Sequence, residues 1–115
     1  MTQDIAVDLG WVPSACTLPT AEQPLRVAEF DALFADAVRG VTRPERARLR
    51  LDLAFGPGNA ARAAELMARE NGCCSFFSFA LTVADGGLTL EVAVPDEHID
   101  VLDALQSRAV SAAAR

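Results

Sequence analysis

The chain has no long apolar run, no basic N-terminal region and few cysteines, and each absence excludes a class of protein. No apolar run approaches the ~18 residues that a membrane-spanning helix needs. The opening segment, MTQDIAVDLG, carries acidic side chains and differs from a signal peptide. We therefore expect a cytoplasmic protein with no membrane partner, and cytoplasmic thiols are kept reduced. The odd cysteine count of 3 also speaks against a structural disulfide.

Positive charge is also scarce. The chain has 10 basic residues against 16 acidic ones, and its formal net charge is −6. The only basic cluster contains Arg43, Arg46, Arg48 and Arg50. A net-acidic domain is poorly suited to binding nucleic acid through its phosphates. We expect no nucleic-acid partner and interpret the four arginines as the solvent-facing side of a strand and its approach.

The length and the apolar content predict one folded domain. The sequence has 115 residues, of which 51% are hydrophobic, and this is enough for a single core that needs no disulfide or metal cross-link. Residues 1–20 are interpreted as an N-terminal arm that carries Cys16 and is broken by Pro13 and Pro19. Residues 21–115 are interpreted as a single α+β domain.

Apolar periodicity predicts three helices and three strands in the order helix, strand, helix, strand, strand, helix. The helices are expected at 21–39, at 60–71 after an Asn59 N-cap, and from an Asp96 N-cap onward. In the first strand, Leu49, Leu51, Leu53 and Phe55 alternate with polar residues and alanine. The other two strands, 77–83 and 88–94, flank the strong hairpin signal Asp85-Gly86-Gly87.

This order of elements predicts a three-stranded, mainly antiparallel sheet covered by helices. The strand-helix-strand unit is right-handed, and the hairpin returns the third strand to the gap between the first two. The result is a split β-α-β variant of a ferredoxin-like domain, in which Leu51 contacts Leu90. The second face of the sheet is expected to be solvent-exposed, or partly covered by the first helix or a second subunit.

Two adjacent cysteines, Cys73 and Cys74, stand in the segment ENGCCSFFSF between the second helix and the second strand. Neighbouring thiols form a disulfide only in strained geometry, but they suit a single soft ion such as Hg(II), As(III), Cu(I) or Zn(II). The topology brings His98, the only histidine, to the same end of the sheet. The predicted soft-metal site therefore contains Cys16, Cys73, Cys74 and His98, although no C-x2-C spacing typical of zinc sites is present.

The run from Glu70 to Val83, followed by a glycine turn and Leu88 to Val92, resembles a small bacterial domain with the signature E-x2-C-C-P-F-F-x-F-x-L. That domain occurs alone or beside regulators similar to the mercury-responsive MerR type. The resemblance covers residues 16–110 and includes a cysteine that matches Cys16. It implies soft-metal or metalloid handling for detoxification, sensing or delivery, with a regulator protein as a partner. Ser75 replaces the proline of the signature, which predicts a less rigid loop.

Two other functional classes fit the same residues. One is a thiol redox protein in which one cysteine attacks and its neighbour or Cys16 resolves, which requires a lowered thiol pKa and solvent access. The other is a non-enzymatic, homodimeric interaction module in which the cysteines are structural, since free cysteine behaves as a small hydrophobe. The sequence leaves open whether the protein is an enzyme. Titration of the reduced thiols with soft ions separates the three classes.

Overall fold

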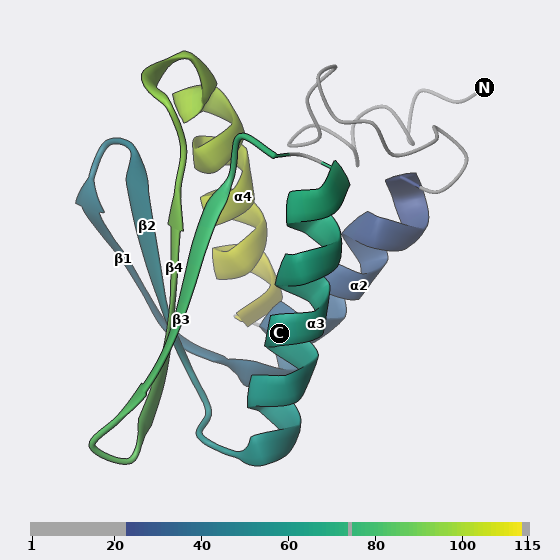
Figure 1. The fold of residues 1–115 in the computed structure, drawn as a ribbon, viewed down its shortest axis with the longest axis vertical. Helices are drawn as coiled ribbons and strands as arrows, with labels where there is room; N and C mark the ends of the chain where they lie inside the picture. Colours follow the sequence, from purple (N-terminus) through teal and green to yellow (C-terminus); the bar gives the residue numbers. More distant parts are fainter. Residues whose placement is uncertain (1–22, 74, 114–115) are drawn as a thin grey trace.

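The computed structural model of the chain describes residues 23–73 and 75–113, and these form an α+β fold (Figure 1). The predicted arm, with Cys16, lies outside the described residues. The described elements, in chain order, are α2 (Gln23–Ala37), β1 (Val38–Glu45), β2 (Arg48–Leu53), α3 (Pro57–Cys73), β3 (Ser78–Ala84), β4 (Gly87–Ala93), the 3-10 turn η2 (Asp96–His98) and α4 (Ile99–Ala113).

The strands form one antiparallel sheet in the order β1-β2-β4-β3. The prediction that the strand after the hairpin lies between its two predecessors is confirmed, because β4 pairs with β2 on one side and β3 on the other. Leu51 and Leu90 are direct Cα partners in that ladder. The turn is also confirmed: Asp85 and Gly86 have φ values of 54° and 72°, as a type I′ hairpin requires.

The prediction of three strands is wrong, because the sheet has a fourth strand, β1, immediately after α2. We expected the first helix to continue to Arg39, but it ends at Ala37 and the chain becomes extended at Val38. The sequence gives no clear signal for this strand, because its buried and exposed residues do not alternate and its register with β2 shifts twice. Pro44 interrupts the pattern further, and proline is tolerated because β1 is an edge strand.

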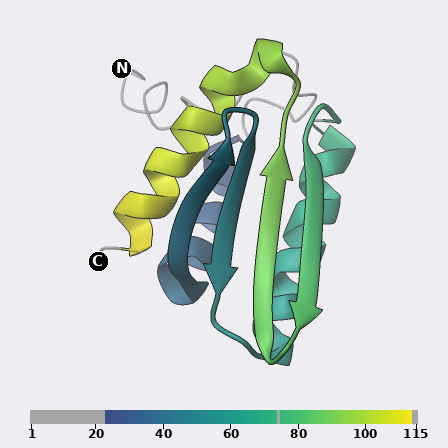
Figure 2. The same ribbon diagram turned by 90° about the vertical axis from the view of Figure 1, so that its left-hand side faces the viewer.

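All three described helices cover one face of the sheet, and Figure 2 shows the other face turned toward the viewer without a helix over it. The alternative that the first helix covers this second face is therefore wrong. Arg48 and Arg50 are exposed there, and Arg50 makes a 3.0 Å ion pair with Glu91 on β4. The core lies between the sheet and the helices, and its fully buried large side chains include Phe30, Phe34, Leu33, Leu49, Leu51, Phe77, Leu90, Leu102 and Leu105.

Three boundary predictions need correction. Phe55 does not continue the buried row of β2, because the strand ends at Leu53 and the Phe55 side chain is 59% exposed. The second helix begins at Pro57, so Asn59 lies inside its first turn rather than at its N-cap. Pro95, not Asp96, is the N-cap residue of the turn that leads into α4, and no side-chain hydrogen bond caps that turn.

Ion pairs fix the direction of the helices relative to one another. Glu29 of α2 contacts Arg69 of α3 at 2.8 Å, and Asp36 contacts Arg62 at 2.9 Å. The later residue of α2 pairs with the earlier residue of α3, so the two helices run antiparallel. The hydrogen bond from Arg69 to Glu29, reinforced by the charge of that carboxylate, raises the pKa of Arg69 above its usual value.

Candidate thiol site at the α3–β3 turn

The two adjacent cysteines fall in the turn between α3 and β3. Cys73 is the last residue of α3, and β3 begins at Ser78. Of the predicted metal ligands, Cys16, Cys74 and the side chain of Cys73 lie outside the described residues, whereas His98 is described. The geometry of the site is therefore built from the residues on each side of the cysteine pair.

A side-chain hydrogen bond closes the turn at its base. The Asn71 amide nitrogen Nδ2 donates to the carbonyl oxygen of Phe77 over 2.7 Å. Asn71 belongs to the last turn of α3, and Phe77 directly precedes β3. This bond fixes the separation of the two ends of the segment that contains the thiols. An Asn-Gly pair is a common signal for such a bond, but the sequence does not reveal that the acceptor is the carbonyl oxygen of Phe77.

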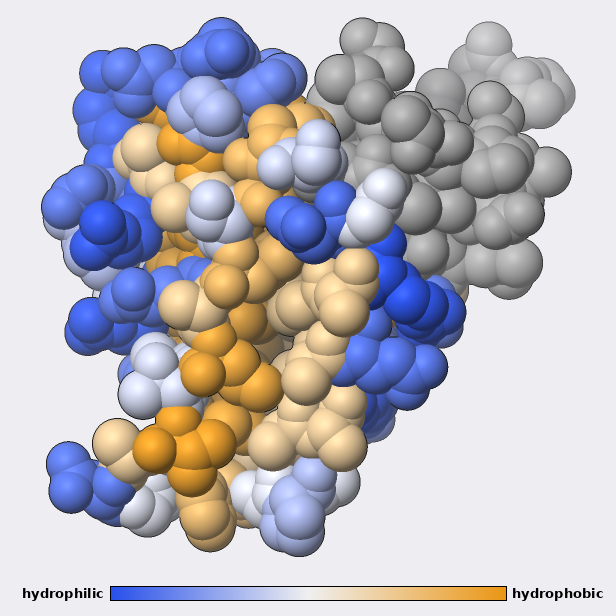
Figure 3. All heavy atoms as spheres, in the orientation of Figure 1, coloured by the Kyte–Doolittle hydropathy of each residue, from blue (hydrophilic) through white to orange (hydrophobic). Residues whose placement is uncertain are grey.

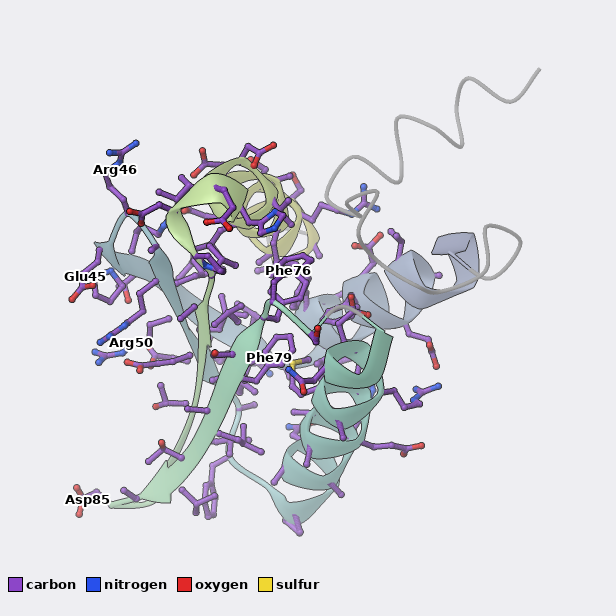
Figure 4. All side chains as sticks on the ribbon, turned by 45° about the horizontal axis from the view of Figure 1, so that its top comes forward. Glu45, Arg46, Arg50, Phe76, Phe79 and Asp85 are labelled. Atoms are coloured by element: carbon purple, nitrogen blue, oxygen red, sulfur yellow. The ribbon has the colours of Figure 1, made fainter. Side chains whose placement is uncertain are left out.

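Aromatic stacking ties the same turn to the beginning of α4. The centroid of the Phe76 ring lies 4.1 Å from that of the His98 ring, with an angle of 23° between the ring planes. It lies 4.5 Å from the centroid of the Phe77 ring. Figure 4 shows Phe76 between the start of β3 and the first turns of α4. The predicted proximity of His98 to the end of the sheet that carries the cysteine pair is confirmed by this contact. The described ring contacts of Phe76 therefore join the turn both to the core residue Phe77 and to His98.

An open hollow of about 470 Å³ lies beside the turn, between α3 and β3. Asn71 and Ser75, which precede and follow the cysteine pair, both contribute to its wall. The described residues that line it are Met67, Ala68, Asn71, Ser75, Phe77, Ser78 and Phe79. A small molecule or hydrated ion can therefore approach the residues that flank the turn without displacing the core.

A buried carboxyl group lies one helical turn before Cys73. Glu70 is 1% exposed and is the one buried charged side chain in the part of the chain that the structure describes. Glutamate is rarely buried, because removing its charge from water is costly. In the sequence, Glu70 is the first residue of the E-x2-C-C signature. Its burial shows that Glu70 lies on the side of α3 that packs against the rest of the protein and not on the solvent-facing side.

The helix dipoles act on the site in opposite directions. Cys73 stands at the C-terminal end of α3, where the partial negative charge of a helix disfavours a thiolate. The N-terminal end of α4 lies nearby through η2, but Asp96 and Glu97 are acidic residues of that turn. The C-terminal end of α3 and the acidic side chains of η2 therefore both place negative charge at this end of the sheet.

Among residues 23–73 and 75–113, no three or more histidine, cysteine, aspartate or glutamate residues are grouped so that they could hold a metal ion. Within the same ranges, no helix is long and apolar enough to cross a membrane.

Comparisons of the chain with protein-family models, curated proteins and solved structures give no match. The resemblance to the bacterial Cys-Cys-Phe-Phe domain stays a prediction that rests on the motif itself. Any functional proposal has to come from the chemistry of the turn and its surroundings.

Proposed function

We propose that the reduced protein binds one soft, thiophilic ion per chain through Cys73 and Cys74, with Cys16 as a third thiolate. The observation that carries the proposal is that two contacts hold the α3–β3 turn in place. These are the Asn71–Phe77 hydrogen bond and the stacking of Phe76 on His98. A turn held at its base and along one side keeps two neighbouring sulfur atoms close at a low cost in entropy.

Sulfur chemistry determines the class of ion. Thiolates prefer soft or borderline ions, which include Cu(I), Zn(II) and, by extension, Hg(II) and As(III). A bond between Cys73 and Cys74 themselves would be strained, so the pair is better suited to sharing an ion than to forming a resting disulfide. The partial negative charge at the C-terminus of α3 disfavours a thiolate at that position. A bound ion carries positive charge and therefore compensates for this repulsion.

His98 is proposed as a fourth ligand. Stacking on Phe76 occupies a face of the imidazole, while both ring nitrogens lie in the ring plane and keep their lone pair or proton for a partner. The stack therefore orients the ring without using up its ligating atoms. Three sulfur atoms and one nitrogen would give the four-coordinate set that zinc prefers, whereas Hg(II) and As(III) need only the thiolates.

Access to the turn favours exchange of the ion over permanent storage. The hollow beside the turn is open and is bordered by Asn71 and Ser75. A site of this kind suits sensing, delivery or detoxification, in which an ion has to enter and leave. A metal-responsive regulator is the proposed partner for such an exchange.

Serine variants test the proposal, because serine is nearly isosteric with cysteine and removes only the soft ligand. Competitive titration of the reduced protein with Hg(II), As(III), Cu(I) and Zn(II) should show a sharp loss of affinity for Cys74→Ser. Cys16→Ser should lose less, because ordering the arm costs entropy that partly cancels the gain from a third ligand. Affinity should rise with pH through the thiol range, since each bound thiolate releases a proton. Equal affinity of wild type and the triple serine variant for every ion would leave the cysteines structural or redox-active.

A further inference from the structure

The two edges of the sheet differ in how well they are protected against further strand pairing. The outer strand β1, VRGVTRPE, carries three charged residues, one proline and two register shifts. Such features block the addition of another strand. The opposite outer strand β3, SFALTVA, has no charge and no proline, and all seven of its residues pair with β4 in unbroken register.

The backbone of β3 offers hydrogen bonds along its outer side. Ala84 and Gly87 flank the two-residue turn and form the first hydrogen-bonded pair of the hairpin. Because hydrogen-bonded and non-hydrogen-bonded pairs alternate along an antiparallel ladder, Phe79, Leu81 and Val83 direct their N–H and C=O groups away from β4. In the sheet that the described residues form, β3 is the last strand on that side.

The same edge is apolar. Val83 is 60% exposed, and Phe79 and Leu81 on the same strand are half-buried. Figure 3 shows hydrophobic surface running over β3 and the adjoining side of α3. A regular, neutral strand that has no further partner strand among the described residues, and that carries exposed apolar side chains, is a surface that natural proteins usually cover.

We propose that β3 pairs antiparallel with β3 of a second copy of the chain, about a two-fold axis at Leu81. In this register all seven residues of each strand are paired, and Leu81 faces its own counterpart while Phe79 faces Val83 of the other copy. The outward-directed groups of these three residues then face one another and form about six interchain hydrogen bonds, two for each facing pair.

The absence of charge on β3 permits a second copy at this edge. A two-fold axis brings identical surfaces together, so a chain with a net charge of −6 tends to place like charges opposite one another. The residues of β3 avoid this cost because none of them is charged. The joined eight-stranded sheet would end in β1 on both sides, where Arg43, Pro44 and Glu45 block further addition. The assembly therefore closes as a dimer.

The dimer is separate from the proposed ion site. Because the paired strands run in opposite directions, the α3–β3 turn of each copy lies at the opposite end of the interface. Each ion site then remains within its own chain. A strand of seven residues is about 24 Å long and covers less than the ~800 Å² per partner of a standard interface, so the dimer should dissociate on dilution.

Sedimentation velocity over a range of concentrations tests the pairing. Wild type should approach twice the 12.2 kDa chain mass as concentration rises. Val83→Lys should remain monomeric, because it places a charge opposite the apolar Phe79 of the other copy. Val110→Lys is the matched control, since Val110 is 49% exposed on α4 and should leave the dimer intact. A monomeric wild type at every concentration, or a Val83→Lys variant that dimerises as strongly as wild type, would overturn the proposal.

Amide hydrogen exchange of the wild-type protein gives an answer that does not depend on a variant folding. The N–H groups of Phe79, Leu81 and Val83 should become more protected as concentration rises. Protection of these amides that is independent of concentration in a monomer would mean that another segment of the same chain covers β3. Fast exchange at all concentrations would mean that the edge stays open. Either result contradicts pairing with a second copy.

Discussion

The two connections of α3 are fastened in the same way but carry different residues. Before the helix, Asn59 Nδ2 donates to the carbonyl oxygen of Ala54 over 2.9 Å. After the helix, Asn71 Nδ2 donates to the carbonyl oxygen of Phe77 over 2.7 Å. In both cases an asparagine of the helix binds the backbone beside the neighbouring strand. The hydrogen bond alone therefore distinguishes neither connection as functional.

The difference lies in what each connection contains and touches. The first contains Gly56 and leads into Pro57, and its aromatic residue, Phe55, is 59% exposed. The second contains the cysteine pair, and its aromatic residue Phe77 is 2% exposed and follows a ring stacked on His98. One connection only reverses the chain, whereas the other is held against both the core and α4. The added contacts of the second connection are the observation on which the proposed ion site rests.

Truncating the two phenylalanines should give the largest contrast. Phe77→Ala removes a fully buried ring and should lower the free energy of unfolding by about 3–5 kcal/mol. Phe55→Ala removes an exposed ring and should change it by less than about 0.5 kcal/mol. Urea denaturation of both variants measures the difference. Similar losses at the two sites would mean that the second connection is not more firmly held than the first.

Removing the two asparagine amides should have equal effects on stability and unequal effects on ion binding. Asn59→Ala and Asn71→Ala each lose one side-chain hydrogen bond, which is worth about 1 kcal/mol. Only Asn71→Ala loosens the turn with the thiols, so only this variant should bind Hg(II) or As(III) more weakly. If Asn59→Ala weakened ion binding as much, the effect would come from global stability rather than from the turn.

Changing the stacked histidine should have a small effect on stability and should separate packing from ion ligation. His98→Ala loses the contact with Phe76, which is worth about 0.5–1.5 kcal/mol for an aromatic pair. His98→Phe keeps an aromatic ring there but has no ligating nitrogen. Reduced Zn(II) affinity in both variants, with stability retained in His98→Phe, is the expected result. Full Zn(II) affinity in His98→Phe would restrict the role of His98 to packing.

The sequence predicted most of the sheet because its strong signals are local. The alternation of Leu49, Leu51 and Leu53 and the Asp85-Gly86 turn determine β2, β3, β4 and their order. The strand β1 could not be predicted in this way. An edge strand with Gly40 and Pro44 is only partly buried, so its pattern does not alternate, and its pairing with β2 depends on contacts distant in sequence.

The candidate site was predictable to a similar degree. The topology correctly brought His98 to the end of the sheet that carries the α3–β3 turn, because the strand directions alone determine which ends meet. The Asn71–Phe77 bond and the burial of Glu70 depend on the angle at which α3 reaches β3, and no periodicity in the sequence encodes that angle. The arrangement of the three thiols is still a prediction.

Native mass spectrometry of a competition between two proteins is the most direct test of soft-ion binding. Reduced wild type and the variant with serine at positions 16, 73 and 74 are mixed in equal amounts, and one equivalent of Hg(II) or As(III) per wild-type chain is added. The expected result is one ion on each wild-type chain, with loss of the displaced thiol protons from its mass and no ion on the variant. An ion distributed equally between the two proteins would contradict a site built from Cys16, Cys73 and Cys74.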